Sequence, residues 1–329
     1  MQRISGTLVF FLAALMLGSC GKKDQSKSTG TPTIAVIPKG TTHEFWKSIH
    51  AGASKAAQEA GVEIIWKGPL KEDDREAQIS VVEDFITRGV SGIVLAPLDE
   101  VALRAPVADA VRVAIPVVIM DSGLKSEDYV SFVATDNYMG GKLGAQRLIE
   151  LLGGKGKVIM LRYMEGSAST AAREQGFLDG MSEAAGITVV SSNQYGGATT
   201  ETSYRASENL LSPFKRPDGS LAIDGIFAPN ESTAFGMLRA LQDGGIAGKV
   251  RFVGFDSSIK LVEGLRKREI DGLVLQNPVR MGYLAVKTMV QHLRGERVEK
   301  RIDTGVAMIT PENMDQPENK ELLEPDLAE

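Results

Sequence analysis

Polar side chains with varied hydrogen-bonding groups stand directly after, or at the end of, short apolar segments of this sequence, or in the stretch that follows one. They supply an ammonium, two carboxylates, a hydroxyl, a guanidinium and two amides: Lys39, Asp121, Asp256, Ser122, Arg173, Asn230 and Gln276. Each hydroxyl of a polyol both donates and accepts hydrogen bonds, so burying a polyol requires partners of both kinds. The set therefore favours a site that buries a small, hydroxyl-rich ligand.

Each of these residues also has an ordinary structural explanation when it is taken alone. Asp and Asn side chains after a strand commonly cap a helix or form a turn. We expect that role first for Asp99, and it stays open for Asn230. A solvated position in a turn is equally open for Lys39. Because the set as a whole is harder to explain in this way, a binding site is the favoured interpretation.

The segment "HEFW" adds His43, Phe45 and Trp46 to the candidates. His43 and Glu44 match the start of the zinc-protease pattern H-E-x-x-H, but Lys47 stands where the second histidine belongs. Flat aromatic rings pack well against the C–H faces of a sugar ring. Core packing at a helix start is the alternative for this aromatic pair. Adjacent helical residues point about 100° apart, so we expect at least one ring to line a cleft.

Other patterns for catalysis or metal binding are absent from the sequence. Three histidines and one cysteine do not make a usual zinc site. There is no G-x-S-x-G motif, and the glycine-rich segment 153–158 precedes an apolar run instead of following one, unlike a phosphate-binding loop. We explain the glycines of 139–144 by close helix packing. We therefore expect no enzyme, no metal and no cofactor.

The elements that must position these residues form a regular alternation. Apolar runs alternate with helical stretches at 33–38, 62–66, 92–97, 116–120, 130–135, 157–161, 187–192, 224–229, 250–255 and 272–276. The alternation is typical of parallel sheets with helices on both faces. About ten strands are too many for one compact open sheet in a chain of this length. We therefore expect an α/β fold with two doubly wound lobes. Ligands bind outside the carboxyl ends of such strands. We expect Gly61, Gly153, Gly186 and Gly244 to end helices.

The composition and the two ends of the chain indicate where the protein is located and which partners it lacks. The chain has 37 Lys+Arg, 42 Asp+Glu and no long basic run, so we expect no nucleic-acid partner. Residues 1–19 have the short apolar core of a signal peptide, and "LGSC" resembles a bacterial lipobox that places lipid on Cys20. An ordinary signal peptide with a chance cysteine is the alternative. We expect residues 20–32 to be a flexible tether and residues 312–329 an irregular acidic tail.

The chain resembles the ribose- and galactose-type periplasmic substrate-binding proteins of ABC transporters over nearly all of residues 33–310. The resemblance is carried by "TIAVIP…EFW", "VSFVATDNYMGGK", "STAAREQGF", "IFAPNESTAFGMLRAL" and "VGFDSS". It implies a ligand cleft between two lobes, an N-terminal lobe of 33–134 plus 277–303 and a C-terminal lobe of 135–276 plus 304–311. It also implies a three-strand hinge, which closes over the ligand, near Ala134–Asp136, Gln276–Pro278 and Asp303–Gly305.

The resemblance further implies roles for single residues. Phe45 and Trp46 correspond to the aromatic pair that sandwiches the sugar ring, and Asp121 to the carboxylate that holds ring hydroxyls. Arg173 corresponds to the guanidinium that bridges the ligand and the far lobe. The remaining hydrogen-bonding residues of the cleft are Asn230, Asp256 and Gln276.

Departures from the ribose-type pattern leave the ligand open. Ser122 stands where ribose-type proteins have arginine, and Lys39 where they have a small residue. The aromatic residue expected soon after 187–192 is missing, and Ala198, Thr199 and Thr200 follow instead. Lys39 together with Asp121-Ser122 is closer to the autoinducer-2 and rhamnose binders. An aldose, a deoxy sugar, a polyol and a sugar acid stay open, and we expect Lys39 and His43 to decide among them.

The sequence therefore predicts an exported, lipid-anchored, monomeric protein of the periplasm or cell surface. It captures a sugar-like ligand and delivers it to an ABC permease. One alternative is a sensory module that docks on a chemoreceptor or sensor kinase, including one for an autoinducer-2-type ligand. A periplasmic sugar enzyme is a weaker alternative.

Overall fold

The structure is a computed structural model that describes residues 2, 30–325 and 327. The chain divides into two units, Met1–Gly30 and Thr31–Glu329, and every helix and strand given below belongs to the second. The expected signal peptide, apart from Gln2, and Cys20 lie outside the described residues. Among the described residues, no helix is long and apolar enough to cross a membrane.

The first sheet has six strands in the order β11-β5-β4-β3-β1-β2, and every neighbouring pair is parallel. Its strands are β1 (Thr33–Ile37), β2 (Glu63–Trp66), β3 (Gly92–Leu95), β4 (Val117–Met120), β5 (Ser131–Ala134) and β11 (Arg301–Asp303).

The second sheet repeats this topology in the order β12-β10-β9-β8-β6-β7. Its strands are β6 (Lys155–Arg162), β7 (Gly186–Tyr195), β8 (Gly225–Phe227), β9 (Arg251–Phe255), β10 (Gly272–Gln276) and β12 (Val306–Ile309). The sheet is mixed and not wholly parallel as we expected, because β12 reaches it by a short connection from β11 and pairs antiparallel with β10. The prediction of an α/β fold with two lobes is confirmed.

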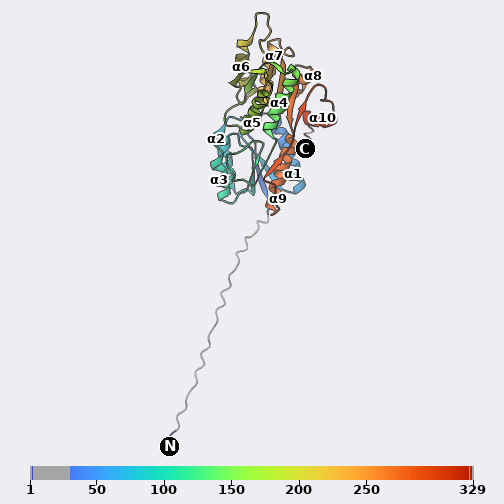
Figure 1. Ribbon diagram of the computed structural model, residues 1–329. Coiled ribbons are helices and arrows are strands. Elements are labelled where there is room, and N and C mark those ends of the chain that lie inside the picture. Colours follow the sequence, from blue (N-terminus) through green and yellow to red (C-terminus); the bar gives the residue numbers. More distant parts are fainter. Residues whose placement is uncertain (1, 3–29, 326, 328–329) are drawn as a thin grey trace. The chain divides into compact units, whose positions relative to one another are not determined.

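Helices cover both faces of each sheet (Figure 1). The first sheet lies between α1 (Glu44–Ala60) with α9 (Pro278–Leu293) and α2 (Arg75–Arg88) with α3 (Arg104–Arg112). The second lies between α4 (Asn137–Leu152) with α5 (Ala168–Ser182) and a layer of α6 (Thr200–Leu211), α7 (Glu231–Asp243), α8 (Ile259–Arg266) and α10 (Pro317–Leu323). A 3₁₀ turn, η1 (Ser212–Phe214), follows α6.

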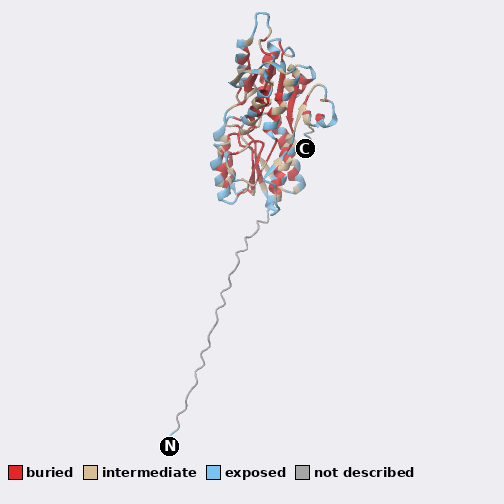
Figure 2. Cartoon of the chain, in the orientation of Figure 1, coloured by how far each residue is buried: buried red, intermediate tan, exposed pale blue. Residues whose placement is uncertain are grey.

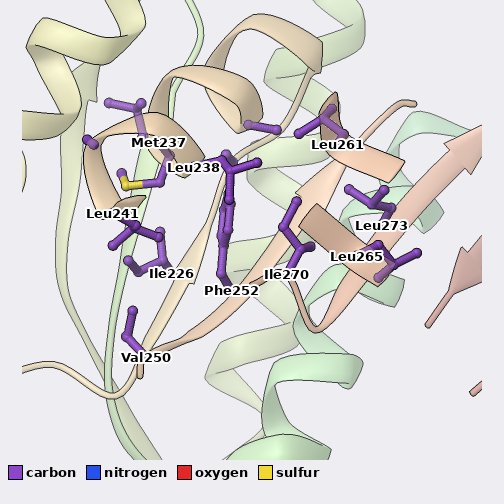
Figure 3. Packing of buried hydrophobic residues seen from close by; sticks show 14 of the residues in the cluster. Ile226, Met237, Leu238, Leu241, Val250, Phe252, Leu261, Leu265, Ile270 and Leu273 are labelled. Carbon is purple, nitrogen blue, oxygen red and sulfur yellow. The ribbon is translucent and has the colours of Figure 1, made fainter. Parts of the chain in front are cut away.

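The strands are apolar at consecutive positions because both faces of each sheet are buried. In β1, Ile34 and Val36 pack into the cluster under α1 and α9, whereas Ala35 and Ile37 pack into the cluster under α2 and α3. Figure 2 shows the buried residues concentrated in the strands and on the inner faces of the helices. In the second lobe, Phe252 of β9 lies between the side chains of α7 and those of α8 (Figure 3).

The chain passes between the two sheets at three places. It leaves the first sheet after β5 and enters α4, which packs on α5 of the second lobe. It leaves the second sheet after β10 and enters α9, which packs on α1. It crosses a third time between β11 and β12.

Two expectations about local structure are wrong. Gly186 begins strand β7 instead of ending a helix, because α5 has already stopped at Ser182. The acidic end is not irregular throughout, since α10 forms within it. Gly61 and Gly153 do end helices, each in the left-handed conformation that favours glycine.

Reciprocal glycines bring one pair of helices into backbone contact in each lobe. A Cβ atom on Gly52 of α1 would lie 1.9 Å from the carbonyl oxygen of Val279 in α9. A Cβ atom on Gly141 of α4 would lie 2.0 Å from the carbonyl oxygen of Arg173 in α5. The expected role of the 139–144 glycines in close helix packing is therefore confirmed, and it fixes the backbone of a candidate site residue.

We expect Gly141→Ala to lower the stability of the protein by roughly 1–3 kcal/mol, because the added methyl group must push α4 and α5 apart. Urea denaturation at neutral pH measures this change. Gly123→Ala is the control, because its Cβ atom would meet nothing closer than 3.6 Å. Equal stability of the two variants would contradict the close packing.

Candidate functional site

A narrow cavity of about 20 Å³ lies between the two lobes. The first lobe lines it with Lys39, His43, Phe45, Trp46, Glu72 and Asp121, and the second with Tyr163, Ser169, Thr170, Arg173, Asn230, Glu231, Asp256 and Gln276. This volume is far below the usual range for ligand pockets, because side chains of both lobes fill most of the space between them. The wall is mainly polar and charged, with three aromatic side chains.

The structure brings all the candidate residues of the sequence to this cavity except Ser122. Ser122 is buried beside it, and its Oγ accepts a hydrogen bond of 3.0 Å from the backbone N–H of Ser169 in the other lobe. Asn230 lines the cavity and also caps α7, where its Oδ1 accepts from the N–H of Thr233. Asp99 stays outside and accepts from the N–H groups of Val101 and Ala102, as a turn residue does.

Strand ends place the two principal aspartates. Asp121 follows β4 in the first sheet and Asp256 follows β9 in the second. Both have left-handed backbones, with φ of 62° and 68°. This conformation is uncommon outside glycine and is tolerated best by Asp and Asn. Residues in such conformations often belong to ligand sites, and these two occupy equivalent positions in the two lobes.

Lys39 ties the lobes together through all three of its donors. Its Nζ is 2.9 Å from Oδ2 of Asp121 in its own lobe. It also donates to the hydroxyl groups of Ser169 at 3.0 Å and Ser167 at 3.4 Å in the other lobe. Because Lys39 is almost fully buried, it is not the solvated turn residue that the sequence left open.

Arg173 is held entirely by the second lobe. Its Nε donates to Oδ1 of Asn137 at 2.8 Å, and its Nη1 donates to the carbonyl oxygen of Pro229 at 2.9 Å. The guanidinium lies over the ring of Phe255 at 3.9 Å and within 3.7 Å of the Asp256 carboxylate. These contacts fix a cation at the wall of the cavity.

The aromatic rings of Phe45 and Trp46 belong both to the wall of the cavity and to the hydrophobic core. The rings of Phe45 and Trp46 meet edge to face at 5.0 Å, and both line the cavity while packing into the core of the first lobe. Tyr163, directly after β6, adds an aromatic ring from the second lobe. The second lobe thus presents an aromatic ring to the cavity from the end of β6, and not from the segment after 187–192 where the resemblance placed one.

Two polar atoms at the cavity have no protein partner among the described residues. Gln276 is buried, and its Nε2 donates to Asp256 at 2.7 Å, which leaves Oε1 without a donor. His43 is paired through Nδ1 with Glu72 at 2.8 Å, and no contact to its Nε2 is found in the described part of the chain. The cavity thus offers a free acceptor at Gln276 and, because despite burial Glu72 raises the pKa of His43 to about 9 and keeps its ring protonated at neutral pH, a donor at Nε2 of His43.

Carboxylates also join the lobes at helix N-termini, where free N–H groups favour negative charge. Glu231 of α7 accepts from the N–H groups of Glu44 and Phe45 in α1, at 3.3 and 3.1 Å. Glu44 in turn accepts from the N–H of Ile259, the first residue of α8. Burial raises the pKa of Glu231 to about 7, although His43 and the amides act against the shift.

Sequence reasoning missed Glu72, Tyr163, Ser169, Thr170 and Glu231. Tyr163 directly follows β6, and Glu231 begins α7 in the segment that follows β8, so the rule that selected the other candidates would have found them. Ser169 and Thr170 lie in the segment that contains Arg173. Glu72 carries no such signal, because it lies in the middle of a charged loop beyond β2.

The raised pKa of Glu231 predicts a pH-dependent stability. The folded protein holds the Glu231 proton more tightly than the unfolded chain does. Glu231 therefore does not lower the unfolding free energy below about pH 4.5, and it lowers that free energy by the full amount above about pH 7. Unfolding free energy should therefore fall between those values, by roughly 1–3 kcal/mol. Glu231→Gln should flatten this part of the profile in urea denaturation. Glu201→Gln, exposed in the first turn of α6, should leave it unchanged, and an unaltered slope in Glu231→Gln would contradict the assignment.

Comparison with known proteins places the chain in a family. A model of the periplasmic binding protein domain matches residues 34–297. The ribose import binding protein of Haemophilus influenzae is 29% identical over 285 residues, which is 87% of this chain and 94% of that protein. The D-allose-binding periplasmic protein of Escherichia coli is 28% identical over 91% of this chain and 93% of its own length.

Solved structures agree with the fold. A solute-binding protein of an ABC transporter from Agrobacterium vitis, with bound D-fucose, is 35% identical with a TM-score of 0.84, covering 88% of this chain and 99% of that one. A carbohydrate-transporter solute-binding protein from Agrobacterium radiobacter, in complex with D-arabinose, is 33% identical with a TM-score of 0.85, covering 90% and 100%. This chain therefore belongs to the periplasmic binding protein family, as a ribose-type member with two α/β lobes.

Proposed function

We propose that this protein binds a small neutral sugar or sugar-like polyol between its lobes and delivers it to an ABC permease. The observation that carries the proposal is the pair of free polar atoms in the cavity, the Gln276 Oε1 acceptor and the His43 Nε2 donor. Hydroxyl groups satisfy both, since each can donate and accept. The aromatic rings beside them suit the C–H faces of a sugar ring.

The charges of the cavity favour a neutral ligand over a sugar acid. Its cations each have a carboxylate partner: Lys39 with Asp121, His43 with Glu72 and Arg173 with Asp256. Glu231 is a fourth carboxylate. A ligand carboxylate would therefore add a charge that no free cation offsets, and burying an unpaired charge is costly. Aldoses, deoxy sugars and polyols remain.

The contacts between the lobes support a clamp that opens and closes. We propose that the lobes, 33–134 plus 277–303 and 135–276 plus 304–311, move about the three crossings near Ala134–Asp136, Gln276–Pro278 and Asp303–Gly305. Arg301 donates to the carbonyl oxygens of Ala134 and Thr135, so it links two of these crossings. Lys39, Glu44 and Glu231 carry contacts that opening must break.

A ligand screen tests the function. Mass spectrometry of the purified protein identifies any sugar that it carries, and thermal shifts then compare D-fucose, D-arabinose, D-ribose, polyols and sugar acids. We expect neutral sugars to raise Tm, because a ligand that binds only the folded state stabilises it. We expect sugar acids to leave Tm unchanged. A shift with sugar acids alone, or with none of these compounds, would contradict the proposal.

Variants of two buried glutamines distinguish an effect on ligand binding from an effect on stability. Gln276→Met should reduce sugar affinity at least about tenfold by calorimetry, because the free acceptor is lost, and should lower apo stability by roughly 1 kcal/mol, because Asp256 loses one hydrogen bond. Gln78 is the matched control, since Pro38, Ala96 and Leu98 satisfy all its hydrogen bonds at 2.9 Å. Gln78→Met should destabilise the fold by roughly 2 kcal/mol or more.

The lipid anchor is a separate proposal, supported by "LGSC" and the tether-like composition of 20–32. Cys20→Ala should move the exported protein from the membrane fraction to the soluble fraction, because it removes the residue that would carry lipid. Immunoblots of fractionated cells measure the distribution. If the variant stays with the membrane, the lipobox interpretation is wrong.

A further inference from the structure

Glu72 occupies an unusual position for a glutamate of a charged loop. It lies in the connection between β2 and α2, where its neighbours Lys71 and Asp73 are exposed, yet only 7% of its own surface is accessible. The chain makes room for it at Gly40. A Cβ atom on Gly40 would lie 2.9 Å from Cγ of Glu72 and 3.3 Å from its backbone nitrogen. The two loops therefore fit together only with glycine at position 40 or with a shift of Glu72.

Both carboxylate oxygens of Glu72 accept hydrogen bonds from residues of the cavity. Oε1 accepts from the indole Nε1 of Trp46 at 2.5 Å and lies 2.8 Å from Nδ1 of His43. Oε2 accepts from the hydroxyl group of Tyr163. The first two donors belong to the first lobe, and Tyr163 follows β6 of the second. One buried carboxylate thus joins three candidate ligand-contacting side chains across the cleft.

We propose that Glu72 is the positioning residue of this site, which holds His43 and Trp46 in place and, through Tyr163, ties them to the closed arrangement of the lobes. This inference rests on the sugar-binding function proposed above. With Nδ1 of His43 occupied by Glu72, its Nε2 is the nitrogen left for a ligand. With the indole N–H occupied, Trp46 has only its ring to offer.

The electrostatics support this arrangement. Burial alone would lower the pKa of His43, but the charge and hydrogen bond of Glu72, with Glu231 and Asp256 nearby, raise it to about 9. Burial alone would raise the pKa of Glu72, whereas His43, Lys39 and the hydroxyl of Tyr163 lower it to about 2. His43 is therefore a cation at neutral pH, and its Nε2 is a donor to the ligand.

Glu72→Gln tests the proposal, because the amide keeps the shape of the side chain and removes its charge. NMR titration of ¹³C-labelled histidine follows His43, assigned with the variants His50→Gln and His292→Gln. We expect the pKa of His43 to fall from about 9 to 6.5 or below. Affinity for D-fucose and D-arabinose, measured by calorimetry at pH 7, should fall at least about tenfold. Asp73→Asn removes the same charge from the exposed neighbour and should change neither quantity.

Tyr163→Phe removes only the hydrogen bond between Tyr163 and Glu72, which joins the two lobes. This variant also provides a test of the proposal if Glu72→Gln does not fold. It should leave His43 charged at pH 7 and still weaken sugar binding, because the second lobe loses its contact with Glu72. Wild-type affinity in both variants, or an unchanged pKa of His43 in Glu72→Gln, would overturn the proposal. A wild-type protein that binds neither sugar but shows the expected His43 shift would overturn the sugar-binding function and support the positioning role.

Discussion

Pairing of buried charges is the constraint on which the closed structure depends. An ionised group that leaves water without a partner costs several kcal/mol. Here Lys39 lies 2.9 Å from Asp121, His43 lies 2.8 Å from Glu72, and Arg173 lies 3.7 Å from Asp256. Both partners of each pair come from the same lobe, so the charges stay matched when the lobes separate. The contacts across the cleft are mainly hydrogen bonds to hydroxyl and backbone groups, which water can replace.

The fold supplies positions that suit these groups. Parallel strands end at one edge of each sheet, and the two edges face one cavity. Helices that start at the same edge present free N–H groups, which Glu231 and Glu44 use reciprocally across the cleft. The aspartates after β4 and β9 share a left-handed backbone. The two lobes therefore present these aspartates with the same local backbone geometry.

Much of this arrangement could be predicted from the sequence, because it follows from local patterns. The apolar runs locate the strands, and the residues after several of these runs, such as Asp121 and Asn230, lie at the cavity. Glu72 could not be found in this way. Its burial depends on the contact of two loops, at Gly40 and at Tyr163, which are far apart in the chain. The sequence pattern shows only a polar run there.

The direction of β12 could not be predicted from local sequence patterns either. A strand of four residues after a sharp connection has too little sequence to indicate its direction, and only pairing with β10 shows that it is antiparallel. The same limit explains Gly186. A glycine between a helix and a strand can end the first or begin the second, and the choice depends on where α5 stops, which the packing of α5 on α4 determines.

The structure changes the interpretation of the residues that depart from the ribose-type pattern. Lys39 was expected to decide ligand specificity, but its three donors already meet Asp121, Ser167 and Ser169. An ammonium group has no fourth donor, so Lys39 can contact the ligand only by giving up a partner. From its contacts to the serines of the other lobe, we propose a role for Lys39 in closure. Ser122 fits the same role, since its hydroxyl accepts from the N–H of Ser169. We propose that recognition falls instead to groups with unused capacity, such as His43 on one side of the cavity and Gln276 on the other.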